Sequence, residues 1–324
     1  STDYFNTKLY TGNESTRSET GVGFQPDFTW IKVRSRADPH ILTDAVRGTS
    51  SQLSSDTNGA QQTFSNMITS FNSDGFSLGA NVDVNRNSET FASWNWKAGG
   101  GQGSSNTDGS INTTYTSVNT TAGFSICQYT GTGSNATVGH GLGVAPKMII
   151  VKKLSSTSQW YTYHASIGAT KYLDLESTAA ESTSSANWND TAPTTTVFSL
   201  GTNSNVNASG QTYIAYCFAE KTGYSKFGSF TGNANADGTF VYTGFKPAFL
   251  MIKRATGGTG NWHLFDSKRL GYNVNNYGVQ PNLNSAENTA NDLDLLSNGF
   301  KNRQSGNDLN GSNTYIYMAF AEAP

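Results

Sequence analysis

Two stretches of the chain place an arginine three residues after an aspartate, just past a short apolar run: Asp44 with Arg47 and Asp266 with Arg269. An aspartate and an arginine at this spacing can form a charge-assisted pair that pins a turn. The same groups could instead grip a polar ligand. In a third stretch of the same pattern His164 and Ile167 take the two places, so we expect no catalytic role that all three stretches share.

Other residues with catalytic or metal-binding chemistry are sparse. The four histidines have no cysteine or glutamate nearby at metal-ligand spacing, which predicts neither a metal site nor a cofactor; they are His40, His140, His164 and His263. His140 lies between two glycines, in an expected exposed hairpin turn. There is no nucleophile elbow and no phosphate-binding loop. The sequence does not exclude a pair of carboxylates for glycoside hydrolysis. We interpret the aspartates that lie beside Gly or Asn as turn formers. We expect no enzymatic activity.

Aromatic residues in polar loop sequence are the better candidates for binding. A flat ring with Asn and Asp neighbours can stack on a sugar while the neighbours donate hydrogen bonds. The alternative is a ring that folds back to cover the end of its own sandwich. The candidate ligand-binding residues are Trp188, Tyr224, Tyr272 and Tyr277.

A ten-residue pattern occurs three times and indicates what positions these groups. It begins with a glycine and an apolar residue, continues to a proline, and reaches a lysine six residues after that proline; the three copies span 23–32, 143–152 and 244–253. The intervening residues are apolar on both alternating faces, as in a strand buried from two sides. Proline suits the first residue of such a strand. We expect the lysine to keep its ammonium group in water.

The matching continues outside that strand, which predicts three homologous units. An aromatic-Thr-Gly triplet precedes the proline by 16, 17 and 17 residues, and a phenylalanine follows it by 50, 52 and 53 residues. A closing aromatic lies 15 residues after each phenylalanine. From this pattern we predict a core of Phe28, Trp30, Phe76, Trp96, Ile150, Phe198, Phe218, Phe249, Phe300 and Phe320.

Composition supports an all-β fold. Gly is frequent, only 14% of residues are charged, and the net charge is −2, which gives no electrostatic case for binding nucleic acid. No apolar run is long enough to span a membrane. We predict three tandem antiparallel sandwich-like units, each burying its own core, which can pack around a pseudo-threefold axis.

The expected boundaries follow from the repeat. Residues 1–98 form unit one, 99–122 a flexible Gly/Ser-rich linker with one extra strand, 123–220 unit two, 221–226 a short linker and 227–324 unit three. The short second junction predicts close contact between units two and three, with unit one held more loosely. The stretch 286–296 reads as a polar loop leading to a strand at 293–295. Cys127 and Cys217 are expected to be buried, and could pair only if their strands are neighbours.

Three blocks of the chain resemble a domain family that is repeated in tail-fibre-like structural proteins of bacteriophages, many of them marine. The blocks are 21–32, 70–79 and 138–146, and the resemblance extends over all three units. It implies a place on a virion that is assembled in the host cytoplasm, and it implies no activity.

Two functions compete on these grounds. The chain could be a tail-fibre or tail-tip adhesin that binds a host-surface glycan or protein, a function favoured by the loop aromatics. It could instead be a capsid or tail decoration protein. Because the first unit begins at Tyr4, we expect no fibre shaft ahead of it, which favours decoration. A third hypothesis is a tailspike enzyme that cleaves surface polysaccharide. Expected partners are other virion proteins, in a homo-oligomer or a symmetric assembly on the particle.

Overall fold

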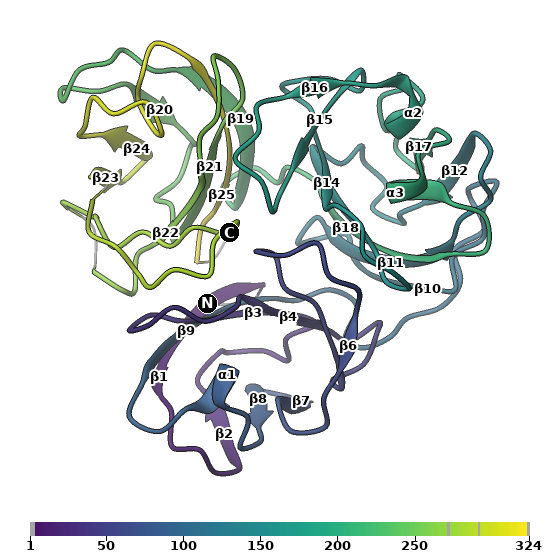
Figure 1. Ribbon diagram of the computed structural model, residues 1–324, viewed down its shortest axis with the longest axis horizontal. Coiled ribbons are helices and arrows are strands. Elements are labelled where there is room, and N and C mark those ends of the chain that lie inside the picture. The colour runs from purple at the N-terminus through teal and green to yellow at the C-terminus, as the bar shows by residue number, and fades with distance from the viewer. Residues whose placement is uncertain (1–3, 271–272, 291, 323–324) are drawn as a thin grey trace.

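The computed structural model describes residues 4–270, 273–290 and 292–322, and almost all of its regular structure is β (Figure 1). Three lobes surround a common centre, with unit one in purple and blue, unit two in teal, and unit three in green and yellow. The predicted all-β fold with antiparallel sheets is confirmed.

Unit one contains a four-stranded inner sheet and a three-stranded outer sheet. Its elements are β1 (Phe5–Thr11), β2 (Arg17–Thr20), β3 (Phe28–Val33), β4 (Ile41–Asp44), β5 (Ser51–Gln52), β6 (Gln62–Thr63), β7 (Ile68–Asn72), β8 (Gly75–Leu78), α1 (Val82–Asn85) and β9 (Thr90–Trp96). The inner sheet has the order β1-β9-β3-β4 and the outer sheet the order β2-β8-β7. Helix α1 is a single turn, begun by Asn81, whose side chain accepts a hydrogen bond from the Asp83 N–H.

Unit two repeats this order and extends the inner sheet at both ends. Its elements are β10 (Tyr115–Asn119), β11 (Phe124–Thr130), β12 (Ala136–Gly139), β13 (Met148–Lys153), β14 (Tyr161–His164), β15 (Lys171–Asp174), β16 (Ser182–Thr183), α2 (Ser185–Trp188), β17 (Val197–Leu200), α3 (Ser204–Asn207) and β18 (Thr212–Phe218). The inner sheet runs β10-β11-β18-β13-β14-β15-β16, and β12 pairs with β17 in the outer sheet.

Unit three has the same two layers. Its elements are β19 (Ser225–Thr231), β20 (Phe240–Tyr242), β21 (Phe249–Arg254), β22 (Trp262–Asp266), β23 (Leu293–Leu296), β24 (Gly299–Asn302) and β25 (Thr314–Phe320). The inner sheet runs β19-β25-β21-β22 and the outer sheet β20-β24-β23. Strand β23 agrees with the strand expected at 293–295.

Side chains from the inner sheets point alternately to two cores. In unit one, Ile31 and Val33 point into a core between its own two sheets, whereas Phe28 and Trp30 point to a central core. The central core contains buried residues of all three units. Units one and two bury cores of their own, as expected. The central core was not expected, and the strands are apolar on both faces because the second face packs against the other units.

The predicted core residues are all buried, with at most 4% of any side chain exposed: Phe28, Trp30, Phe76, Trp96, Ile150, Phe198, Phe218, Phe249, Phe300 and Phe320. The first and last strands of the chain meet at the centre, where the rings of Phe5 and Phe320 stack with centroids 5.8 Å apart. The ring of Phe218 in unit two lies edge-on to Phe320, so the expected contact between units two and three is present. Unit one was expected to be held more loosely, but it packs against both other units in the same core, through Phe5 and through Phe28, which stacks on Tyr216.

The segment after β9 forms the predicted extra strand, β10, but it is not a flexible linker. Gly99 N–H donates to Ser117 Oγ at 3.0 Å, and Gly100 N–H donates to Asp27 Oδ2 at 2.9 Å. A Cβ at Gly103 would lie 1.9 Å from the Thr116 carbonyl oxygen. Glycine is needed here for close packing rather than for flexibility. In the part of the chain that the structure describes, no helix is long and apolar enough to cross a membrane.

Candidate functional site

Two of the four predicted ligand-binding aromatics are buried, so their predicted exposure is wrong. Trp188 is 2% exposed, its Nε1 donates to the Lys171 carbonyl oxygen at 3.1 Å, and its ring meets Tyr163 edge-on. It covers the end of its own sandwich. Tyr224 is 1% exposed and packs edge-on against Phe320 in the central core. The residues that cover these two rings are not adjacent to them in sequence. The polar neighbours in each loop therefore gave no sign that the ring is buried.

Of the other two aromatics, only Tyr277 belongs to the described residues. Tyr277 is half-buried, and the Arg34 guanidinium of unit one lies over its ring, 5.9 Å from the centroid. Tyr277 therefore takes part in the contact between units one and three. Tyr272 lies outside the described residues.

The two predicted Asp–Arg pairs form, and each also holds a neighbouring unit. In both pairs the arginine Nε donates to the aspartate Oδ2 at 2.5 Å, and the side chains are at most 1% exposed. Asp44 Oδ2 also accepts from the Tyr216 hydroxyl of unit two at 2.7 Å, and Asp266 Oδ2 from Trp94 Nε1 of unit one at 3.0 Å. Buried in this way, the pairs cannot grip a ligand from solution.

In unit two, uncharged residues make the contact to the neighbouring unit that the Asp–Arg pairs make in units one and three. His164 takes the aspartate position, and its Nε2 lies 3.2 Å from the Tyr317 carbonyl oxygen of unit three. Its Nδ1 accepts from the Ser166 N–H, so Nε2 carries the proton and donates. Burial lowers the pKa of His164 to about 4. Met318 stands where the other units have Trp94 and Tyr216, so a carboxylate here would have neither a ring donor nor an arginine.

Three loops, which we call the clasps, each reach from one unit to the next. Clasp 1 (54–61) lies on unit two, clasp 2 (174–181) on unit three, and clasp 3 (280–287) on unit one. Matched main-chain hydrogen bonds join them: Gln61 N to Leu154 O at 3.0 Å, Glu181 N to Ala255 O at 2.9 Å, and Glu287 N to Arg34 O at 2.9 Å. The contacts run in one direction and close a ring.

A buried ring in each receiving unit contacts the clasp. Trp160 Nε1 donates to the carbonyl oxygens of Ser54 and Thr57, Trp262 Nε1 to that of Asp174, and His40 Nε2 lies 3.1 Å from that of Gln280. His40 Nδ1 accepts from Trp30 Nε1 at 2.9 Å, so its Nε2 is the donor. Each ring thus satisfies clasp carbonyl groups that would otherwise be buried without a partner.

The three repeated lysines are buried, contrary to the expectation that their ammonium groups reach water, and two of them contact a clasp. Lys32 Nζ donates to the Asn284 carbonyl oxygen of clasp 3 at 3.2 Å, and Lys253 Nζ to that of Thr178 in clasp 2 at 3.1 Å. Lys152 Nζ donates within its own unit, to the Lys153 carbonyl oxygen. Burial lowers the pKa of all three lysines to about 8.

Each clasp also carries one side chain that accepts from the main-chain N–H of the buried ring residue in its own unit. Asp56 Oδ1 accepts from the His40 N–H, Glu176 Oε2 from the Trp160 N–H, and Asn282 Oδ1 from the Trp262 N–H. Burial raises the pKa of Asp56, and raises that of Glu176 to about 7. Clasps 1 and 2 therefore carry a titratable carboxyl group at the position where clasp 3 carries a neutral amide.

The outer sheets of the three units differ in the side chains of their edge strands, whereas the contacts between units are similar in all three. Strands β2, β12 and β20 pair with equivalent strands, because Glu19, Val138 and Val241 lie opposite Phe76, Phe198 and Phe300. The residues flanking that central position are Ser18 and Thr20 in unit one, Thr137 and Gly139 in unit two, and Phe240 and Tyr242 in unit three.

Unit three alone presents large rings at these places. Phe240 is 44% exposed and Tyr242 63% exposed. Both lie on β20, which is an edge strand of its sheet, in the upper left lobe of Figure 1. We call this pair the aromatic edge. Sequence reasoning missed it, although alignment of the three units on Phe76, Phe198 and Phe300 would have placed two aromatic residues opposite small ones.

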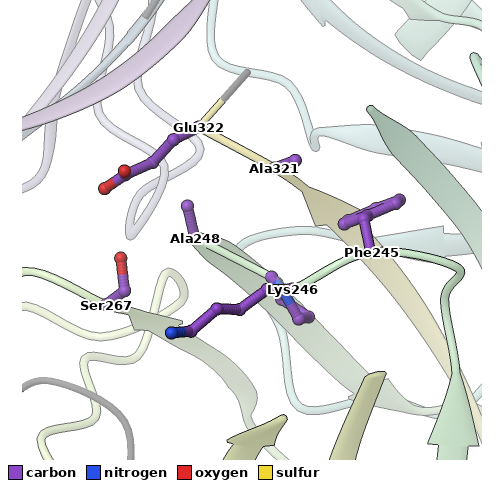
Figure 2. A pocket seen from close by; sticks show the side chains of 7 residues that line it. Phe245, Lys246, Ala248, Ser267, Ala321 and Glu322 are labelled. Atoms are coloured by element: carbon purple, nitrogen blue, oxygen red, sulfur yellow. The ribbon is translucent and has the colours of Figure 1, made fainter. Parts of the chain in front are cut away.

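Cavities offer weaker candidates. One of about 230 Å³ lies at the start of β21, and Figure 2 shows Ala248 in its wall, with Phe245 on one side and Ser267 and Glu322 on the other. Glu322 is already paired with Lys268 at 2.7 Å. A second, of about 350 Å³, lies between units one and two and is lined by Arg47, Gln61 and other polar residues. The first has an apolar wall but no convergent set of free polar groups, and the second is mainly polar, so neither resembles a typical small-molecule site.

The remaining candidates for chemistry are buried or dispersed. Within the described ranges no three His, Cys, Asp or Glu side chains gather as metal ligands would. His140 is buried, not exposed as expected, because Nδ1 accepts from the Leu142 N–H and Nε2 meets the Thr194 carbonyl oxygen. Cys127 and Cys217 are buried free thiols on the neighbouring strands β11 and β18.

The fold and the site define an all-β protein of three mutually clasped units with an aromatic edge on one of them. A family model described as a domain of unknown function (DUF7483) matches residues 1–324. The chain belongs to this family. Comparisons with curated proteins and with solved structures give no significant match.

Proposed function

We propose that this chain is a non-catalytic surface protein of a bacteriophage virion that attaches to the host-cell surface through the aromatic edge. The observation that carries the proposal is the exposure of Phe240 and Tyr242 at positions where units one and two have small residues. Exposed paired rings on a rigid sheet are typical of binding surfaces. The virion setting is supported by the resemblance of all three units to repeated domains of phage structural proteins.

The absence of catalysis in this proposal is supported by where the titratable groups lie. The carboxyl groups whose pKa burial raises most, Glu176 to about 7 and Asp174 to about 6, belong to clasp 2. Glu176 is committed to the Trp160 N–H. Glu176 thus fixes clasp 2 to its own unit, and the aromatic edge has no comparable carboxyl pair on β20.

Adsorption of purified, fluorescently labelled protein to cells of the propagating host tests attachment. The variant Phe240→Ser/Tyr242→Thr gives β20 the side chains that unit one carries at the same positions. We expect it to lose adsorption at least tenfold while keeping the melting temperature. The matched control, Ser18→Ala/Thr20→Ala on β2, should adsorb like the wild type. Equal adsorption by all three proteins would refute the role of the aromatic edge.

A decoration function is the second candidate, and the closed ring of clasps favours it. Three units joined by matched contacts make a body that fits a threefold position on a capsid or tail. In this case other virion proteins would be the partners. Particles that lack the protein would then lose heat or osmotic resistance, and purified protein would not adsorb to host cells. Labelling of the protein on intact particles would locate it.

A further inference from the structure

The open edge of β20 has main-chain groups that face solvent. In the β20–β24 pair, Thr243 N–H donates to the Asn298 carbonyl oxygen and Asn302 N–H to that of Thr239. In an antiparallel pair, alternate residues point their N–H and C=O groups away from the partner strand. Phe240 and Tyr242 are those residues, and no described residue bonds to their main-chain groups.

The equivalent edge in unit two is covered by the segment 108–113, which bends at 108–110 and then pairs with the strand at Ile111. Ile111 N–H donates to the Thr137 carbonyl oxygen at 2.9 Å, and Thr137 N–H donates to Ser110 Oγ at 2.9 Å. Ile111 forms a parallel bridge with Val138 and is 6% exposed. Thr137 corresponds to Phe240, so the same edge position accepts main-chain pairing from another segment elsewhere in this molecule.

The equivalent edge in unit one is open but protected. Ser18 and Thr20 are exposed and polar, and Arg17 and Glu19 on the same strand form an ion pair at 2.6 Å. Polar and charged side chains on an edge strand discourage pairing with another chain. Unit three lacks both the covering segment of unit two and the polar side chains of unit one.

We propose that β20 binds an extended polypeptide segment of a partner protein, which adds as a strand beside Phe240 and Tyr242. The main-chain groups of these residues would pair with the added strand. An apolar side chain of that strand would lie next to Val241, as Ile111 lies next to Val138, and its other side chains would contact the two rings. This inference rests on the proposed attachment function and names a protein, not a glycan, as the ligand.

A peptide derived from the segment that covers unit two tests strand addition directly. The probe has the sequence of residues 104–113, in which Ser110 keeps the hydroxyl that accepts from the Thr137 N–H in unit two and would accept from the Phe240 N–H here. We expect saturating peptide to slow amide hydrogen exchange at Phe240 and Tyr242 by about tenfold in the full chain. The matched control is the same peptide N-methylated at the isoleucine, which keeps the side chain but loses the donor. Equal protection by both peptides, or none by either, would overturn the inference.

Protein variants separate the rings from the main chain. Phe240→Ser removes a ring and keeps the N–H, whereas Phe240→Pro removes both without removing a bond to β24, because this N–H faces outward. Strand addition predicts that proline weakens binding of the peptide more than serine does. The melting temperature checks that the proline variant is folded, and Ser18→Pro on β2 is the matched control. If both Phe240 variants keep their melting temperature and lose peptide binding to the same extent, strand addition is contradicted.

Host cells separate this inference from the proposed function. Protein adsorption that is lost after protease treatment of the cells, and kept after periodate oxidation, supports a polypeptide ligand. The reverse result would overturn the inference and leave attachment intact, with a glycan as receptor. Protection of β20 by the peptide without any adsorption to cells would instead refute the proposed attachment and leave strand addition standing.

Discussion

The inner side of each unit, which faces its neighbours, differs from the outer side in how closely the three units agree. On the inner side the strand order, the clasps and the buried rings match in all three units. On the outer side the edge strands β2, β12 and β20 are respectively polar, covered and aromatic. Contacts that hold the body together tolerate little change, whereas an edge that faces solvent is free to acquire binding specificity.

The largest expected contrast is between two phenylalanines of unit three. Phe249→Ala should lower the free energy of unfolding by about 3–5 kcal/mol, because Phe249 is fully buried and its loss leaves a cavity in the central core. Phe240→Ala on the aromatic edge should change it by less than about 0.5 kcal/mol. Urea unfolding of the two variants measures both. A cost below about 1 kcal/mol for Phe249→Ala would mean that the central core does not hold the units.

The next contrast concerns the junction that carries no charge. His164→Asp should cost about 2–4 kcal/mol, because Ile167 and Met318 offer the new carboxyl neither an arginine nor a ring donor. Adding Ile167→Arg and Met318→Tyr reproduces the Asp44–Arg47–Tyr216 contact and should recover part of that loss. Thermal or urea unfolding of the single and triple variants is the measurement. Failure of the triple variant to recover any stability would show that the junctions are not equivalent.

A smaller effect is expected from pH at the clasps. The raised folded-state pKa of Glu176, about 7, means that its protonated form is favoured in the folded protein. The contribution of protonated Glu176 to folding stability is fully present below the unfolded-state pKa of 4.5. It is lost as pH rises through the folded-state pKa of about 7. Asp56 acts in the same direction. The buried histidines act oppositely, since burial lowers the pKa of His164, so the variant must be compared with the wild type.

The variant Asp56→Asn/Glu176→Gln supplies neutral acceptors, as Asn282 does in clasp 3. We expect the stability of the variant relative to wild type to rise by roughly 1–3 kcal/mol between pH 5 and pH 7.5. Urea midpoints across that range are the readout. A difference between variant and wild type that does not vary with pH would show that neither carboxyl group is protonated preferentially in the folded state.

The smallest effect on stability should come from the aromatic edge itself. Because Phe240 and Tyr242 are exposed, the variant Phe240→Ser/Tyr242→Thr should unfold within about 0.5 kcal/mol of the wild type. Differential scanning calorimetry checks this. A larger loss would indicate that the rings stabilise the outer sheet and would weaken the case for a binding surface.

Local pattern was sufficient to predict the sheets and much of the core. The strands after each repeated proline and the burial of Phe76, Phe198 and Phe300 follow from spacing and alternation, and the Asp–Arg pairs follow from a separation of three residues. That the three units descend from one duplicated ancestor stays a prediction.

Contacts between units could not be predicted in this way. Lys32 and Lys253 are buried because carbonyl groups of another unit surround their ammonium groups, and the sequence near each lysine does not reveal those partners. Tyr224 is buried for the same reason, by Phe320, which is distant in sequence. The aromatic edge had a visible signal, the alternation Phe240-Val241-Tyr242, but its meaning depends on comparison with the equivalent strands.

The restriction of the aromatic edge to a single unit has a consequence for valency. Three identical chains clasped in the same ring would each present an open, ring-bearing strand, and such a trimer could cross-link with others edge to edge. Because the three units here are segments of one chain, the strands β2 and β12 can be polar or covered while β20 stays open and aromatic. Under the proposed function, each molecule would attach through a single strand and would not polymerise.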